Sequence, residues 1–429
     1  MKKLSLFTML LAFAVAINLS SCSKDDDSND NGNGGGGNGD IENELKGEVT
    51  GTLTKGEYFV TADIIVPAGQ TLTLEPGVIL SFVGDGLSPE SSPEIKLDGN
   101  LKAVGTASDP IMFTLREEER TVDNAYEGKW GGIQASSTTD YLIMQHCIVE
   151  FTGGPADGNR PDIYDAGEPR YAIHFGNPSG TMIFDKCTLR HIADDGIRPQ
   201  GGGRFAFTNS VFYNIGETGG EGINFKDGSV GDVCYNLFYG VATNGSKPAG
   251  GGDGVPQTNI NNYNNTFVNC GFRRVQAGRG GSINYEQGAR GLNHNNIIVN
   301  CRFGIRFRAD RLPDMDNIGY SHTLYYASDE TDRDNFFPST DVDANNNRLS
   351  EEQEGDILNQ DPKFVNYSVS TSKLNADLNP SWNFTLSSDS PGKGTGKTDF
   401  SPVFSTLSAG GFTLTIPQPS ADFGAFGAQ

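Results

Sequence analysis

A short pattern of alternating side chains recurs along the middle of this 429-residue chain at irregular intervals. In each copy the third position is apolar, the first is usually small or polar, and successive copies begin 23 to 40 residues apart. Because side chains of an extended segment alternate between two faces, each copy predicts a short strand with one apolar face. The irregular spacing predicts a repeating coil that is lengthened in places by loop insertions. The copies are Cys147–Phe151, Cys187–His191, Ser210–Asn214, Asn236–Gly240, Thr266–Cys270 and Ile297–Cys301.

A second strand pattern follows each of these copies: Gly or Ala, then Ile or Val, then a variable polar residue. Short strand patterns separated by turns also occupy residues 64–114. Abundant Gly and Asn, with few helix-favouring runs, agree with an all-β chain that has many turns. The clear copies of the second pattern are Gly132–Gln134, Ala172–Phe175, Gly196–Pro199, Gly222–Phe225 and Gly304–Phe307; Gly240–Ala242 and Val275–Gln276 are weaker copies.

With these two strand patterns, the chain resembles the right-handed parallel β-helix family, the solenoid of pectate-lyase-like proteins. The resemblance covers about residues 49–429, and the segments Asp361–Phe364, Phe384–Pro391 and Asp422–Phe426 are similar to the family's C-terminal rungs. We therefore expect an all-β, right-handed parallel β-helix solenoid over residues 45–429, closed by C-terminal capping rungs. The resemblance does not specify an activity, because this one fold supports many.

Five cysteines lie within the predicted solenoid, and none belongs to a Cys-x-x-Cys motif. The repeat places Cys147 and Cys187 in one column and Cys270 and Cys301 in another. An odd number of thiols cannot all pair, and a zinc site requires tighter spacing. We therefore interpret these cysteines, together with Cys234, as small buried hydrophobic residues.

The N-terminus carries two lysines, an apolar run at Leu4–Ile17 and the tetrapeptide Leu19–Cys22. This order is typical of a secretory signal peptide. With a cysteine at the cleavage point, it resembles a bacterial lipoprotein signal, which implies that residues 1–21 are removed and Cys22 is lipidated. Acylation would anchor the protein to the membrane through Cys22 without a spanning helix. The alternative is an ordinary secreted protein with a chance cysteine.

Residues 22–44 are rich in Asp, Asn and Gly and predict a flexible acidic tether. The run Ser23–Asp27 resembles the surface-export signal of lipoproteins in one group of Gram-negative bacteria, which implies an outer-membrane, cell-surface location. A solvated acidic tether explains the same residues. The net charge of −22 argues against nucleic acid as a partner, because phosphate contacts require a basic surface.

If the second strands stack, their outward side chains form a polar strip with adjacent rungs about 4.8 Å apart. Such a strip suits a linear polymer, and we expect a polysaccharide ligand. The predicted column contains Gln134, His174, Arg198, Asn224, Ala242, Gln276 and Arg306. The parallel column two residues later contains Ser136, Gly176, Gln200, Lys226, Asn244, Gly278 and Arg308.

The C-terminal end of this strip is unusually basic for so acidic a chain, with eight arginines between Cys270 and Arg311. Guanidinium groups bind carboxylates and sulfates through paired hydrogen bonds, so the segment predicts a site for an anionic glycan or another anionic partner. The alternative is structural pairing with acidic loop residues, namely Asp157, Asp162, Asp165 and Glu168.

Catalysis is a second hypothesis for the same strip. The resemblance to β-helix lyases implies an Arg or Lys base, often with Ca²⁺ held by acidic residues. The candidates are Arg198, Lys226 and His174, with Asp194 and Asp195 as weak metal ligands. The alternative is a turn at Asp194–Gly196 followed by an exposed strand residue. The chain lacks the Gly-His-Gly and Arg-x-Lys motifs of β-helix polygalacturonases, which weakens that comparison.

Three functional hypotheses follow. The first is a surface lipoprotein that binds an extended glycan and accompanies an outer-membrane nutrient transporter. The second is a surface polysaccharide lyase or hydrolase. The third is a structural or adhesive subunit whose ligand is a protein.

Overall fold

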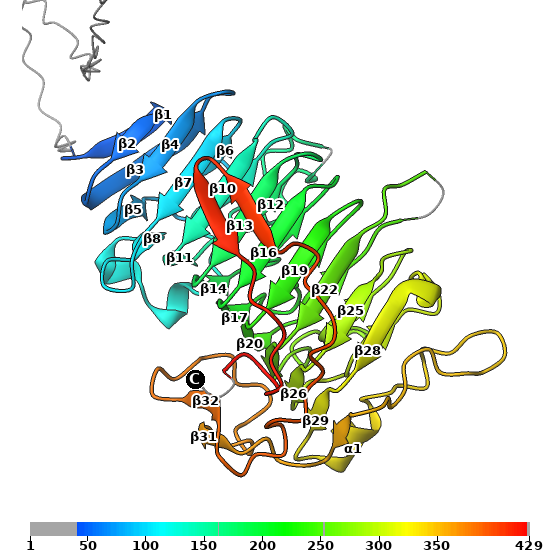
Figure 1. The fold of residues 1–429 in the computed structure, drawn as a ribbon. Coiled ribbons are helices and arrows are strands. Elements are labelled where there is room, and N and C mark those ends of the chain that lie inside the picture. Colours follow the sequence, from blue (N-terminus) through cyan, green and yellow to red (C-terminus); the bar gives the residue numbers. More distant parts are fainter. Residues whose placement is uncertain (1–40, 162, 252–253, 427–429) are drawn as a thin grey trace, which may run out of the picture. The chain divides into compact units, whose positions relative to one another are not determined.

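The computed structural model describes residues 41–161, 163–251 and 254–426. The predicted signal peptide, Cys22 and most of the predicted tether lie outside these residues. The described chain forms an all-β parallel β-helix in which three strands per coil stack on the equivalent strands of the next coil (Figure 1). No helix in this part of the chain is long and apolar enough to cross a membrane.

Three ladders of parallel strands form the faces of the coil. Strand β1 (Glu44–Glu48) begins the solenoid and pairs with the long strand β3 (Gly56–Val66), whose two halves belong to ladder one and ladder two. Ladder one continues through β5 (Val78–Phe82), β8 (Ile111–Leu115), β11 (Cys147–Glu150), β14 (Thr188–Ile192), β17 (Val211–Ile215), β20 (Leu237–Val241), β23 (Thr266–Val268), β26 (Ile297–Val299), β29 (Leu324–Tyr326) and β30 (Ile357–Leu358).

Ladder two carries the predicted polar strip, and ladder three closes the coil. Ladder two contains β6 (Ile95–Leu97), β9 (Ile133–Ala135), β12 (Ile173–Phe175), β15 (Ile197–Pro199), β18 (Ile223–Phe225), β21 (Asn244–Pro248), β24 (Gly281–Tyr285) and β27 (Arg306–Phe307). Ladder three contains β2 (Gly51–Leu53), β4 (Thr71–Leu74), β7 (Asn100–Val104), β10 (Tyr141–Gln145), β13 (Thr181–Asp185), β16 (Arg204–Thr208), β19 (Val230–Cys234), β22 (Asn259–Tyr263), β25 (Gly291–His294) and β28 (Ile318–Ser321).

The C-terminal segment leaves the coil and packs back on its outside. It contains the antiparallel pairs β31 (Phe364–Asn366) with β32 (Asn383–Leu386) and β33 (Thr406–Ala409) with β34 (Phe412–Thr415). The red hairpin of β33 and β34 lies over ladder three, where Leu407 and Leu414 pack on Ile183 (Figure 1). Helical structure is limited to α1 (Glu330–Asp334) and the short 3₁₀ turns at Glu117–Glu119, Val122–Asn124 and Met315–Asn317 among the described residues.

Stacked side chains fill the interior of the coil. The rings of Phe212 and Phe238 stack at 4.7 Å and those of Phe238 and Phe267 at 4.8 Å between centroids, which matches the spacing of adjacent parallel strands. A second internal column begins with the thiols of Cys147 and Cys187 and ends in a ladder of buried asparagine amides. Asn236 donates its Nδ2 to Oδ1 of Asn265 at 3.1 Å, and Asn265 donates to Oδ1 of Asn296 at 3.2 Å.

The asparagine ladder corrects the predicted register of the last two repeats. Phe267 pairs with Phe238, and Ile298 pairs with Phe267, so these copies begin one residue earlier than expected. Val268 and Val299 therefore belong to a second cluster, outside the coil, that the C-terminal segment covers. Asn265 and Asn296 set this register. Each lies at the turn before its strand and accepts a hydrogen bond from a backbone N–H of the neighbouring rung.

The cysteine interpretation is confirmed for the described thiols. The ladder one pairings align Cys147 with Cys187 and Cys270 with Cys301, and all five cysteines are buried and free. The thiol of Cys187 accepts a hydrogen bond from the backbone N–H of Cys147 at 3.3 Å, which is the role that Asn side chains take on later rungs.

Candidate functional site

Ladder two brings most of the predicted polar column together. The strand pairings place Gln134, His174, Arg198 and Asn224 side by side on four successive rungs, as predicted. The next two positions are Lys247 and Asn284, and Arg306 then completes the column.

Two predicted members of the column were therefore wrong. Ala242 lies before β21, and Gln276 lies in an exposed loop before β24. The strands form further along the chain because Ser246 and Ile283, rather than Val241 and Val275, occupy the inward column beside Ile223. A sequence signal for Lys247 existed: Lys247-Pro248 repeats the Arg198-Pro199 dipeptide, and both prolines pair with a phenylalanine of a neighbouring rung.

The first part of the column is covered by the loop between β11 and β12. Tyr164 of this loop donates its hydroxyl to Oε1 of Gln134 at 2.5 Å, and Gln134 donates Nε2 to the carbonyl of Tyr171 at 2.8 Å. His174 is buried beside them, with Nδ1 3.1 Å from the carbonyl of Ala135. Burial, together with the positive charges of Arg160 and Arg198, lowers the pKa of His174 to about 3. The imidazole is therefore neutral at physiological pH, and a ligand reaches it only if the loop moves.

The candidate metal ligands Asp194 and Asp195 have different surroundings. Asp195 accepts the backbone N–H of Glu221 and the amide of Asn224, both at 2.7 Å, and one guanidinium nitrogen of Arg198 lies 3.6 Å from its carboxylate. Burial first, then the charges of Asp195 and Glu221, raise the pKa of Asp194 to about 7. No group of three or more His, Cys, Asp or Glu side chains in the described parts of the chain is arranged to hold a metal ion. Asp194 and Asp195 are therefore not part of such a group.

The middle of ladder two holds a buried network of ion pairs that the sequence did not reveal. The ammonium of Lys247 lies 3.5 Å from a carboxylate oxygen of Glu221 and 3.2 Å from one of Glu286. All three side chains are at least nine-tenths buried. The carboxylates of Glu221 and Glu286 lie on either side of the Lys247 ammonium, so the network joins side chains from different rungs.

Lys226 lies next to this network but makes no ion pair with any described residue. Its side chain is partly buried in the column two residues beyond Asn224. Burial, followed by the positive charges of Lys247 and Arg198, lowers the pKa of its ammonium to about 8. Arg198 remains accessible as well, with one-fifth of its side chain exposed, and its guanidinium lies 4.8 Å from the ring centre of Tyr171. Lys226 and Arg198 are therefore cations with contact to solvent.

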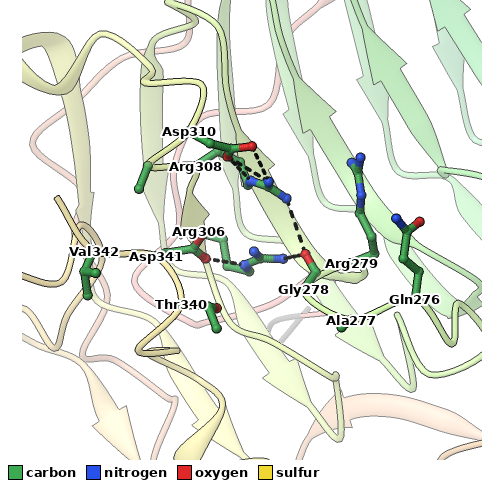
Figure 2. Close-up of a pocket in the computed structure, with 11 residues that line it drawn as sticks. Gln276, Ala277, Gly278, Arg279, Arg306, Arg308, Asp310, Thr340, Asp341 and Val342 are labelled. Atoms are coloured by element: carbon green, nitrogen blue, oxygen red, sulfur yellow. Dashed lines mark hydrogen bonds and ion pairs between the residues drawn. The ribbon is translucent and has the colours of Figure 1, made fainter. Parts of the chain in front are cut away.

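A cavity of about 490 Å³ lies at the C-terminal end of ladder two (Figure 2). Three segments line it: the loop at 276–279, strand β27 with the residues after it, and the loop at 340–342. Arg306 is almost fully buried and donates Nε to Asp341 at 2.6 Å. Arg308 binds the carboxylate of Asp310 through two hydrogen bonds of 2.8 and 2.7 Å. Arg279 also lines the cavity.

The arginine-rich segment is only partly explained by structural pairing. Among the described residues, the acidic loop residues Asp157, Asp165 and Glu168 form no ion pair with these arginines, and Asp162 lies outside the description. Arg306 pairs instead with Asp341, and Arg308 pairs with Asp310. Arg273 caps backbone carbonyls, including that of Gly240 at 2.6 Å, and Arg302 donates to the carbonyl of Arg274.

No family model, no curated protein and no solved structure matches this chain.

Proposed function

We propose that this chain is a surface lipoprotein of the Gram-negative outer membrane, anchored through Cys22, whose pectate-lyase-like β-helix binds an extended anionic polysaccharide. One observation carries the binding proposal: accessible cations lie on one face of ladder two, from Arg198 on β15 to Arg308 beyond β27. These rungs are four steps apart, or about 19 Å at about 4.8 Å per step. A ligand that contacts both ends must be a chain of several sugars.

The chemistry of these side chains favours an acidic ligand. Lys226 and Arg279 have no ion-pair partner among the described residues, and Arg198 keeps only a long contact of 3.6 Å with Asp195. Unpaired cations on a chain of net charge −22 attract carboxylates or sulfates without the cost of breaking strong internal pairs. Gln200 and Gln276, which are also partly or fully exposed, provide hydrogen-bonding groups for sugar hydroxyls.

Affinity electrophoresis of the detergent-extracted full chain tests this proposal. Gels containing polygalacturonate, alginate or chondroitin sulfate are compared with gels containing neutral xylan or starch. We expect retardation only in an acidic gel, and its loss in Arg198→Ala and Lys226→Ala, while Lys186→Ala, an exposed lysine outside the strip, is retarded like the wild type. Equal mobility in every gel contradicts polysaccharide binding.

The membrane part of the proposal has its own test. Mass spectrometry of the mature N-terminus identifies an acylated Cys22 if the lipoprotein proposal is correct, and Cys22→Ser releases the protein from the membrane. Antibody labelling of intact cells then distinguishes the outer leaflet from an inward-facing anchor. Copurification with an outer-membrane transporter identifies a nutrient-uptake complex, whereas copurification with surface proteins and indifference to sugars favours a structural or adhesive subunit.

One observation favours a second candidate, a polysaccharide lyase. A general base works best when its pKa lies near the operating pH, and the pKa of Lys226 is lowered to about 8. In a lyase, the neutral amine of Lys226 removes the proton beside a uronic carboxylate and a carbon–carbon double bond forms. The glycosidic oxygen leaves, takes a proton from water and becomes a hydroxyl group of the second product. Arg198 binds the carboxylate in this scheme. Ultraviolet-absorbing unsaturated products, absent with Lys226→Ala, establish the lyase; retardation without products establishes a binding protein.

A further inference from the structure

The arginines of the C-terminal cavity have different amounts of free hydrogen-bonding capacity. Arg306 is 2 % exposed, and its guanidinium donates to Asp341, to the carbonyl of Gly278 at 3.1 Å and to that of Gly280 at 3.4 Å. Those two carbonyls flank Arg279 in the chain. Arg306 therefore holds the loop on both sides of Arg279, and its own side chain is almost fully buried.

Arg279 projects from this fixed piece of loop along the cavity wall (Figure 2). It forms no ion pair or side-chain hydrogen bond with any described residue, in contrast to Arg306 and Arg308. Gly278 and Gly280, on either side of it, have φ angles of +67° and +89°, a conformation that favours glycine. The bend between them orients an arginine whose five donors remain available.

The guanidinium of Arg308 already holds a carboxylate. Asp310, two residues along the chain, accepts hydrogen bonds from Nε and from one terminal nitrogen, which is the geometry that arginine uses for a carboxylate ligand. The Asp310 side chain is 58 % exposed, compared with 17 % for Arg308. A ligand carboxylate can form the same two hydrogen bonds with Arg308, and a displaced Asp310 side chain, which is already largely in solvent, becomes hydrated.

We propose that Arg279 is the anion-contacting residue of this cavity, that Arg306 positions it, and that Asp310 occupies Arg308 until a ligand carboxylate displaces it. The inference rests on the proposed function and assigns its terminal subsite to a uronic-acid carboxylate. It also assigns Arg306 the role of positioning Arg279, whereas the sequence analysis predicted that Arg306 contacts the ligand directly. Asp310 acts as an internal competitor and lowers the affinity for ligands that bind through this cavity alone.

Titrations of the full chain with sodium galacturonate, oligogalacturonate, sodium sulfate and neutral galactose test the assignment. Arg279→Gln weakens the binding of both galacturonate forms by about tenfold or more, because it removes charge-assisted hydrogen bonds. Asp310→Asn strengthens their binding by up to about fivefold, as expected for removal of an exposed competing carboxylate. The matched controls Arg290→Gln and Asp316→Asn, which change the same residue types outside the cavity, leave both affinities unchanged.

The role of Arg306 is tested by a double substitution. If Arg306 acts only through Arg279, Arg279→Gln with Arg306→Gln binds galacturonate as weakly as Arg279→Gln alone, whereas two independent contacts give additive losses. Asp341→Asn, which keeps Arg306 in place but weakens its hold, gives a partial loss if the single Arg306 variant does not fold. Additive losses overturn the positioning role.

The outcomes separate this inference from the proposed function. Retardation in acidic gels that depends on Lys226 but not on Arg279 supports polysaccharide binding and overturns the inference. Binding of galacturonate that depends on Arg279, without retardation by any polymer, supports the inference and overturns polysaccharide binding. Sulfate binding as strong as galacturonate binding, or weaker binding by Asp310→Asn, overturns the carboxylate-exchange assignment.

Discussion

Replacing Lys226 with methionine should stabilise the folded chain at neutral pH. The folded environment lowers the pKa of this lysine from 10.5 to about 8, chiefly through burial and then through Lys247 and Arg198. A charged lysine at pH 7 is therefore less stable in the folded chain than in the unfolded chain. At about 1.4 kcal/mol per pH unit the shift of the pKa sets an upper limit of about 3.5 kcal/mol. Solvent contact of the side chain reduces the expected gain to about 1–2 kcal/mol.

The pH dependence identifies the cause. Between pH 8 and 10.5 the unfolded chain binds the proton of Lys226 more strongly than the folded chain, so the stability of the wild type rises with pH in this window. The advantage of Lys226→Met is therefore largest below pH 8, decreases as the pH rises, and disappears above 10.5. Urea unfolding at pH 7, 8.5 and 10, followed by circular dichroism, measures it, with the exposed Lys186→Met as the control.

A loss of stability at pH 7 would refute this reasoning, because it would mean that Lys226 makes favourable contacts that outweigh its desolvation. A gain that is the same at pH 7 and pH 10 would show that methionine only improves packing. Stabilisation combined with loss of glycan retardation is the result expected of a residue kept for function at the expense of stability.

Three further predictions concern the solenoid itself. Asn265→Ala should lower stability by about 3 kcal/mol, because it leaves the buried N–H of Asn236 without its acceptor and interrupts the amide ladder; urea midpoints compare it with the exposed Asn345→Ala, which should change little. Phe238→Ala should cost about 3–5 kcal/mol, since its ring lies between two others, and a melting temperature close to the wild type would contradict the stacking. A thiol reagent should label the described cysteines only in denaturant; these are Cys147, Cys187, Cys234, Cys270 and Cys301. Rapid labelling of the native chain would show that these thiols are not in a closed core.

Local sequence was sufficient for much of the site. Gln134, His174, Arg198 and Asn224 follow an Ile that must face the core, so the alternation of a strand alone places them on one outer column. The prediction failed at Ala242 and Gln276. Gly240 and Val241 belong to strand β20 of ladder one, and Val275 and Gln276 lie in a loop. Choosing between Val241 and Ser246 as the inward residue requires knowing which of them lies beside Ile223 on the next rung.

The sequence by itself determined the class of fold and five members of the outer column of ladder two, namely Gln134, His174, Arg198, Asn224 and Arg306. These properties depend on period and composition, which act within a few residues. Only the tertiary structure decided which of those side chains solvent can reach. Burial beneath the loop at 153–171, the Glu221–Lys247–Glu286 network, and the division of the arginines into paired Arg306 and unpaired Arg279 all depend on contacts between segments far apart in the chain. Electrostatics and solvation depend on distance in space, and a solenoid with long inserted loops sets those distances only once it has folded.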